Sequence, residues 1–174
     1  MDQEPKSPNS ELADELLEMV RVDQEMRFAS IKDKKSWDDS IDHRNTARLK
    51  EIIKTFGWPT ISKVGAEASH AAWLLVQHAY AEPDFMKECL ELMRSCTEGD
   101  VALENLAFLE DRLLVMEGKP QVYGSQFRRV NDVFEPSPIA DPEHVDERRA
   151  SMGMSTLAEN ADRLTREWDE AAAK

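Results

Sequence analysis

The segment 64–79 constrains the fold more than any other part of the chain, because it is almost entirely apolar. From Ala71 to Val76 every residue is apolar, so a helix over this segment has no polar face there. A helix that is apolar on all sides is buried inside a domain. The sequence therefore predicts a mostly α-helical fold built around this central helix, with Ser62 as its N-cap.

Helical periodicity and capping residues recur along the rest of the chain. They predict a single domain over residues 10–174, a helical bundle of about six to seven helices. Residues 1–9 are polar and contain proline, and we expect a flexible N-terminus there. Gly57 and Pro59 are expected to end the second helix, and Thr156 and Glu159 to form a capping box for the last one. Besides the central helix, the expected helices are 11–31, 41–56, 83–96, 101–117, 142–153 and 156–171.

The segment 119–133 differs from the rest, because Gly and β-forming residues interrupt the helical pattern. We expect one short extended segment or hairpin there. The proline-containing segment 135–142 that follows is predicted to be a loop.

The charge of the chain excludes two classes of partner. The net charge is −13, from 22 Lys and Arg against 35 Asp and Glu. Proteins that bind nucleic acid or an anionic membrane surface need basic side chains to neutralise phosphates. We therefore expect no nucleic-acid partner and no membrane partner, and the acidity is interpreted as a contribution to solubility.

The two cysteines indicate a reducing compartment. Cys89 and Cys96 lie in one predicted helix, and seven residues of helix rise by about 10 Å, beyond the roughly 7 Å Cα separation that a disulfide tolerates. Free thiols are typical of cytosolic proteins. The sequence shows no secretory apolar region and no apolar run of about 18 residues, so a cytoplasmic protein is expected.

Polar side chains on the central helix are candidates for function, because burial makes them unfavourable unless they are paired or line a cavity. His70, Trp73 and Gln77 are spaced three and four residues apart, which places them on one face of the helix. His78 lies on another side and is interpreted as a structural histidine.

The helix predicted at 101–117 repeats this spacing. Asn105, Phe108 and Arg112 share one of its faces, and Asp111 is adjacent to Arg112. If the two faces meet, they enclose a polar pocket with aromatic walls. Gln121, Tyr123 and Gln126, together with the flexible backbone of Gly124, are placed in sequence to close it.

Two classes of function fit such a pocket. In the first, the protein is an enzyme without a cofactor or metal, in which His70 is the general acid or base. Arg112 then holds an anionic group of the substrate and Tyr123 is the complementary acid. The substrate is a small metabolite or a peptide-like natural product, and the reaction is a hydrolysis, an elimination or an isomerisation. Gln77, Asn105 and Gln126 orient it, and the expected ligand-binding residues are Trp73, Gln77, Asn105, Phe108, Asp111, Gln121 and Gln126.

The second class is a non-catalytic protein that binds a small molecule or a protein partner. A third interpretation is purely structural: His70 is a bonded core residue, Arg112 and Asp111 form an ion pair, and 121–126 is a well-bonded turn. The sequence gives no oligomeric state. His70 and His78 are eight residues apart and diverge by about 80° around a helix, whereas paired metal-binding histidines use four residues, so no metal site is expected.

Three stretches of the sequence resemble a family of small bacterial domains of unknown function. They are GWPTISKVGAEASHAAWLLVQHAY, ENLAFLEDRLLVMEGKPQVYGSQF and PIADPEHVDERRASMGM. Members of that family usually carry an aspartate in place of Tyr80 and a tyrosine in place of Phe108. The resemblance spans residues 41–164, and it implies a shared fold, a shared site location and functional roles for His70 and Gln77.

Overall fold

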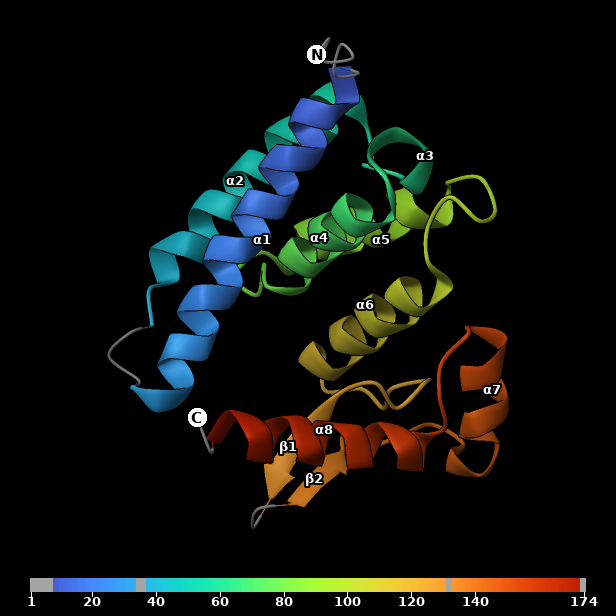
Figure 1. Cartoon of the computed structure of the whole chain (residues 1–174). Coiled ribbons are helices and arrows are strands. Elements are labelled where there is room, and N and C mark those ends of the chain that lie inside the picture. Colours follow the sequence, from blue (N-terminus) through green and yellow to red (C-terminus); the bar gives the residue numbers. More distant parts are fainter. Residues whose placement is uncertain (1–7, 34–36, 131–132, 173–174) are drawn as a thin grey trace, which may run out of the picture. The chain divides into compact units, whose positions relative to one another are not determined.

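A computed structural model describes residues 8–33, 37–130 and 133–172, and most of them are helical (Figure 1). The mostly α-helical fold with one small hairpin is therefore confirmed. The chain divides into two compact units, Met1–Ala102 and Leu103–Lys174, which are described in turn. Of the N-terminus predicted to be flexible, residues 1–7 lie outside the described residues, whereas Pro8 and Asn9 begin the first helix.

The first unit packs four helices against a central one. These helices are α1 (Pro8–Lys32), α2 (Asp39–Phe56), α3 (Ile61–Val64) and α5 (Pro83–Arg94), and each contacts α4 (Ala66–Gln77). As its composition predicts, α4 is the most buried helix of this unit. Its buried apolar side chains are Ala68, Ala71, Ala72, Trp73, Leu75 and Val76.

The prediction of one continuous helix over 64–79 is wrong at both ends. Gly65 has a φ of +85°, outside the helical region, so it separates α3 from α4. Ser62 therefore does not cap α4, and instead its backbone N–H and hydroxyl donate to the carboxylate of Asp100 at 2.6 and 2.8 Å. At the other end α4 stops at Gln77, and His78 is the C-cap.

The ends of α2 follow local capping chemistry. Asp38 is the N-cap, and its carboxylate accepts a hydrogen bond from the backbone N–H of Ser40. At the other end Gly57 adopts a φ of +71° and donates its N–H to Ile53, as the sequence predicts. Trp58 follows with only 3% of its surface exposed, so it anchors this turn in the core.

The second unit combines helices with a two-stranded antiparallel sheet. Its helices are α6 (Leu103–Met116), the short 3-10 helix η2 (Pro142–His144), α7 (Val145–Ser151) and α8 (Leu157–Ala172). Strands β1 (Phe127–Val130) and β2 (Val133–Pro136) pair so that Phe127 lies opposite Pro136. Helix α8 packs on β2, and the capping box at its start is confirmed by hydrogen bonds between Thr156 and Glu159.

The extended segment lies later in the chain than the sequence predicts. The hairpin occupies 127–136, so β2 takes the first part of the segment 135–142 that was expected to be a loop. Residues 122–126 contain no strand, because side chains rather than a strand partner bind much of their backbone. The helix expected from Asp141 begins as η2, one 3-10 turn, and becomes α-helical at Val145.

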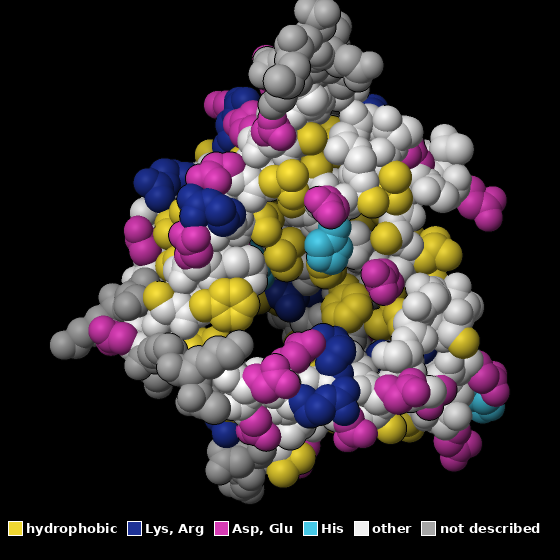
Figure 2. Space-filling model, viewed as in Figure 1, with side chains coloured by type: hydrophobic (Ala, Val, Ile, Leu, Met, Phe, Trp, Pro, Cys, Tyr) yellow, Lys and Arg dark blue, Asp and Glu magenta, His cyan; other side chains and the backbone are white. Residues whose placement is uncertain are grey.

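Charged side chains of both signs are interleaved on the surface. Figure 2 shows Lys and Arg side chains beside Asp and Glu side chains along α1 and along α8. Arg21 pairs with Glu18 at 2.7 Å on α1, and Arg163 pairs with Glu167 at 2.9 Å on α8. Exposed pairs of this kind contribute little to stability. Within the described residues, no helix combines the length and apolar character needed to cross a lipid bilayer.

The structure predicts that Gly124→Ala destabilises the second unit. A Cβ at Gly124 would lie 2.8 Å from Leu157 Cδ1 and 2.9 Å from Ile139 Cδ1, and φ is +64°. Backbone strain and overpacking together lower the free energy of unfolding by about 2–4 kcal/mol. Urea denaturation followed by circular dichroism measures this change.

Gly153→Ala is the matched control, because Gly153 has a similar φ of +72° but no atom within 4 Å of its Cβ position. Only the strain remains there, so we expect a smaller loss of about 1–2 kcal/mol. Equal losses for the two variants would contradict the packing argument.

Candidate functional site

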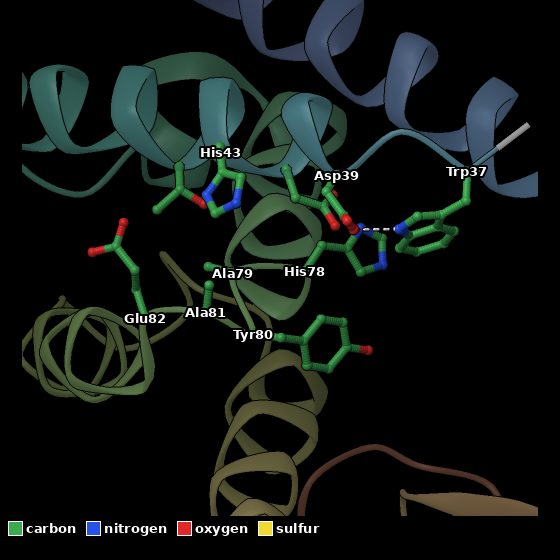
Figure 3. A pocket seen from close by; sticks show the side chains of 10 residues that line it. Trp37, Asp39, His43, His78, Ala79, Tyr80, Ala81 and Glu82 are labelled. Atoms are coloured by element: carbon green, nitrogen blue, oxygen red, sulfur yellow. Dashed lines mark hydrogen bonds between the residues drawn. The ribbon is translucent and has the colours of Figure 1, made fainter.

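A cavity of about 250 Å³ lies in the first unit, where α4 ends. Its walls come from α2, from the turn after α4 and from Trp37 (Figure 3). We call it the His78 cavity. It combines aromatic walls with polar groups, as ligand sites usually do. The side chains that face it include Trp37, Asp39, His43, His78, Tyr80 and Glu82.

His78 is held from behind the cavity by a buried carboxylate. Its Nδ1 lies 2.9 Å from the Oδ2 of Asp23, an α1 residue whose side chain is 0% exposed. Burial raises the pKa of Asp23, but hydrogen bonds from His78 and Arg27 more than compensate, so this pKa lies below its ordinary value. Asp23 therefore stays ionised and orients the imidazole ring.

Arg27 joins this pair to α2. Its guanidinium contacts Asp23 at 3.1 Å and Asp42 at 2.5 Å, with 17% of the Arg27 side chain exposed. Burial raises the pKa of Asp42 above its ordinary value, although Arg27 opposes the shift. The four groups Asp23, His78, Arg27 and Asp42 form one hydrogen-bonded network from α1 through α4 to α2.

Several other charged groups and rings of the cavity also have partners within the unit. Trp37 Nε1 donates to Asp39, as the dashed line in Figure 3 shows, and Lys50 pairs with Glu82. Tyr80 stacks on His78 with ring centroids 6.5 Å apart and an angle of 26°. The cavity is therefore preorganised by internal contacts.

The geometry leaves one nitrogen of His78 open. We assign the imidazole proton to Nδ1, because a carboxylate only accepts hydrogen bonds and Asp23 is the nearest partner of Nδ1. The N–H of Arg27 Nε lies between Nδ1, at 3.1 Å, and the two oxygens of Asp23, at 3.2 Å each, and with this assignment it donates to the carboxylate. Nε2 then holds a lone pair, and no hydrogen bond to it comes from the described part of the chain. A histidine in this state can accept a proton.

His70 differs from the expectation of a buried catalytic histidine. Its side chain is exposed on α4, beside an open, mainly apolar groove formed with Leu17, Val20 and Ala71. Its ring lies 4.7 Å from the ring of Trp73, which is buried. The burial inferred for His70 is therefore wrong, because the apolar surface of α4 is not covered at this position.

The two polar helix faces that were predicted to meet belong to different units. Gln77 is buried in the first unit with 2% of its surface exposed, and Asn105 is buried in the second unit with 3% exposed. The pocket between these two helix faces stays a prediction.

Asp111 and Gln121 shape the loop 121–126 from inside. The Asp111 carboxylate is 0% exposed and accepts backbone N–H bonds from Val122 at 2.7 Å, Tyr123 at 3.0 Å and Ser125 at 2.9 Å. The side-chain nitrogen of Gln121 donates to the carbonyl of Gln126 in the loop and to that of Ser137 beyond it. Its side-chain oxygen accepts a hydrogen bond from the backbone N–H of Gln126. These contacts support the interpretation of 121–126 as a well-bonded turn, whereas the Asp111 carboxylate bonds the loop backbone instead of forming the ion pair with Arg112 that this interpretation expected.

Arg112, Gln126 and Phe108 lie close together in the second unit. Arg112 Nε donates to the Oε1 of Gln126 at 3.0 Å, and Gln126 Nε2 contacts the Phe108 carbonyl at 3.4 Å. Tyr123 is half-buried, and its carbonyl accepts a hydrogen bond from Arg149. The sequence thus identified residues that the structure brings together here.

Sequence reasoning missed the pair of Asp23 and His78. One signal was present: Asp23 follows Leu16 by seven residues, and so shares the helical spacing of the apolar residues Leu12, Leu16 and Met26 of α1. All four side chains are buried. A carboxylate on such a stripe needs a buried partner, but α1 alone does not identify which residue that is.

Both thiols are free, as the sequence predicts. Burial raises the pKa of Cys89 and of Cys96, which makes them weak nucleophiles. Among the described residues, no group of three or more His, Cys, Asp or Glu side chains is arranged to hold a metal ion.

The comparison with known proteins assigns a family. The chain belongs to DUF6624, a family of unknown function, whose family model matches residues 10–169. No curated protein and no solved structure matches the chain.

We predict that Asp23→Asn lowers the free energy of unfolding at pH 7 by about 1–3 kcal/mol, because a hydrogen bond to a buried ion is replaced by a weaker one. The lowered pKa means that the carboxylate stabilises the fold above its ordinary pKa of 3.8. That contribution is lost as the pH falls through the folded-state pKa. Denaturation of both proteins between pH 7 and pH 2 should therefore show a difference that is constant down to about pH 4 and shrinks at lower pH.

Glu25→Gln is the control, since Glu25 is an exposed carboxylate on the same helix that pairs with Arg21. Its stability should match the wild type at all these pH values within about 0.5 kcal/mol. A pH-independent loss in Asp23→Asn would show that the ionised carboxylate is not what stabilises the fold.

Proposed function

We propose that the protein is a cytoplasmic bacterial enzyme that needs no cofactor and carries out acid–base chemistry on a small polar molecule in the His78 cavity. The observation that carries this proposal is the ionised, buried Asp23 bonded to Nδ1 of His78. Two free cysteines support a reducing compartment. The proposal keeps the histidine chemistry expected from the sequence but places it on His78 instead of His70.

In the proposed mechanism, Nε2 of His78 removes a proton from the bound substrate. The imidazolium that forms is stabilised by the carboxylate of Asp23, which keeps the ring oriented and does not itself take the proton. His78 then returns the proton to another substrate atom or to a leaving group. This cycle serves an isomerisation, an elimination or a hydrolysis.

The walls of the cavity favour a compact substrate with hydroxyl or amino groups. The rings of Trp37 and Tyr80 provide flat surfaces, and the carboxylates of Asp39 and Glu82 accept hydrogen bonds. The net charge of −13 argues against nucleic acid and anionic membranes as substrates. A small-molecule ligand is therefore the proposed partner.

The test combines binding with turnover. A library of small polar metabolites is screened by thermal shift, and each compound that binds is incubated with the protein in D₂O and analysed by mass spectrometry. Acid–base turnover is expected to add deuterium or change the mass. His78→Gln should abolish this change and retain binding, because glutamine can hydrogen-bond but cannot exchange a proton at neutral pH.

His144→Gln is the control, because His144 is an exposed histidine in the second unit. Compounds that bind the wild type without any mass change would instead indicate a non-catalytic binding protein. Loss of turnover in His70→Gln but not in His78→Gln would place the chemistry at His70 and contradict the proposal.

A further inference from the structure

The second unit contains a separate cavity of about 170 Å³, formed by α6, α7, α8 and the turn before α8. It uses none of the residues of the His78 cavity. Nitrogen donors, apolar side chains and one carboxylate surround it. These residues include Arg149, Asn160, Arg163, Phe108, Met154 and Glu104.

Arg149 places a buried positive charge at this cavity. It is 1% exposed, and its hydrogen bonds go to the backbone carbonyls of Ser155, Tyr123 and Gly124. Within the described residues, no carboxylate lies within ion-pair distance of it. Asp146 and Asp111 stabilise the charge from beyond ion-pair distance, and a buried cation without a direct ion pair favours an anion beside it.

Asn160 adds an unused donor. Its side chain is 3% exposed, and its Oδ1 accepts a hydrogen bond from Arg163 at 2.7 Å. Arginine can only donate, so this contact fixes the oxygen toward Arg163 and the amide nitrogen on the other side. Among the described residues, that buried Nδ2 has no hydrogen-bond partner.

Arg163 brings a second guanidinium to the cavity. It is close enough to Arg149 for the two charges to oppose each other, which adds to the lowering of the Arg149 pKa that burial causes first. Its exposed side is paired with Glu167. The side chains of two arginines and of Asn160 therefore line one small space.

From these contacts we infer that the cavity of the second unit binds the carboxylate of a small amino acid. Guanidinium groups recognise carboxylates with paired N–H bonds, and the Nδ2 of Asn160 supplies a further donor. Glu104 at the rim disfavours a dianion such as phosphate and instead attracts the ammonium group. Phe108 and Met154 contact a short apolar side chain.

The experiment is a titration of the full-length ¹⁵N-labelled protein, followed by NMR. The probes are the common L-amino acids, propionate as a carboxylate without an ammonium group, and inorganic phosphate. We expect at least one small apolar amino acid to shift the side-chain amide signals of Asn160 with saturation. It should bind more tightly than propionate and phosphate.

Two variants separate the parts of the site. Asn160→Asp keeps the acceptor for Arg163 and replaces the donor by an acceptor, so it should weaken amino-acid binding about ten- to hundredfold. Glu104→Gln should reduce the preference for the amino acid over propionate. Arg166→Gln, which changes an exposed arginine of α8 outside the cavity, should bind as the wild type does.

Circular dichroism and urea denaturation establish that each variant is folded before it is titrated. Failure of every amino acid to shift the Asn160 signals would overturn the inference. Tighter binding of phosphate, or equal affinities of the wild type and Asn160→Asp, would overturn it as well. None of these outcomes bears on turnover in the His78 cavity, so the two proposals fail independently.

Discussion

Hydrogen bonds to buried charged groups organise both units of this chain. A charge can leave water only where other groups replace its solvation. Asp23 is solvated by His78 and Arg27, and Arg149 by three backbone carbonyls. Asp111 is solvated by three backbone N–H groups. Each charge thereby fixes segments that are distant in the sequence, which the apolar cores of the helices would not do alone.

The groups that surround each buried charge indicate whether the charge has a structural role or belongs to a candidate functional site. Among the described residues, the hydrogen bonds of the Asp111 carboxylate are all with the loop backbone, so it determines a loop shape. Asp23 instead bonds a histidine whose second nitrogen is open toward a cavity. Arg149 lies in a cavity that also contains the buried amide of Asn160. In both places, a polar atom that has no hydrogen-bond partner among the described residues lies next to a buried charge.

Local sequence signals predicted the helices well, because periodicity and capping depend on neighbours in the chain. The capping box at Thr156 and the helix end at Gly57 are examples. The break at Gly65 was missed, since an apolar run on both sides of a glycine also fits one longer helix. The candidate site was harder: Asp23 and His78 are 55 residues apart, and only packing of α1 on α4 brings them together.

The loop 121–126 has a consequence for hydrogen exchange. Its amide protons at Val122, Tyr123 and Ser125 are bonded to a carboxylate that solvent does not reach. We expect them to exchange mainly when the loop separates from α6, the helix that carries Asp111. A segment without strand or helix would therefore exchange as slowly as a core element, and its amides would report the opening of the whole second unit.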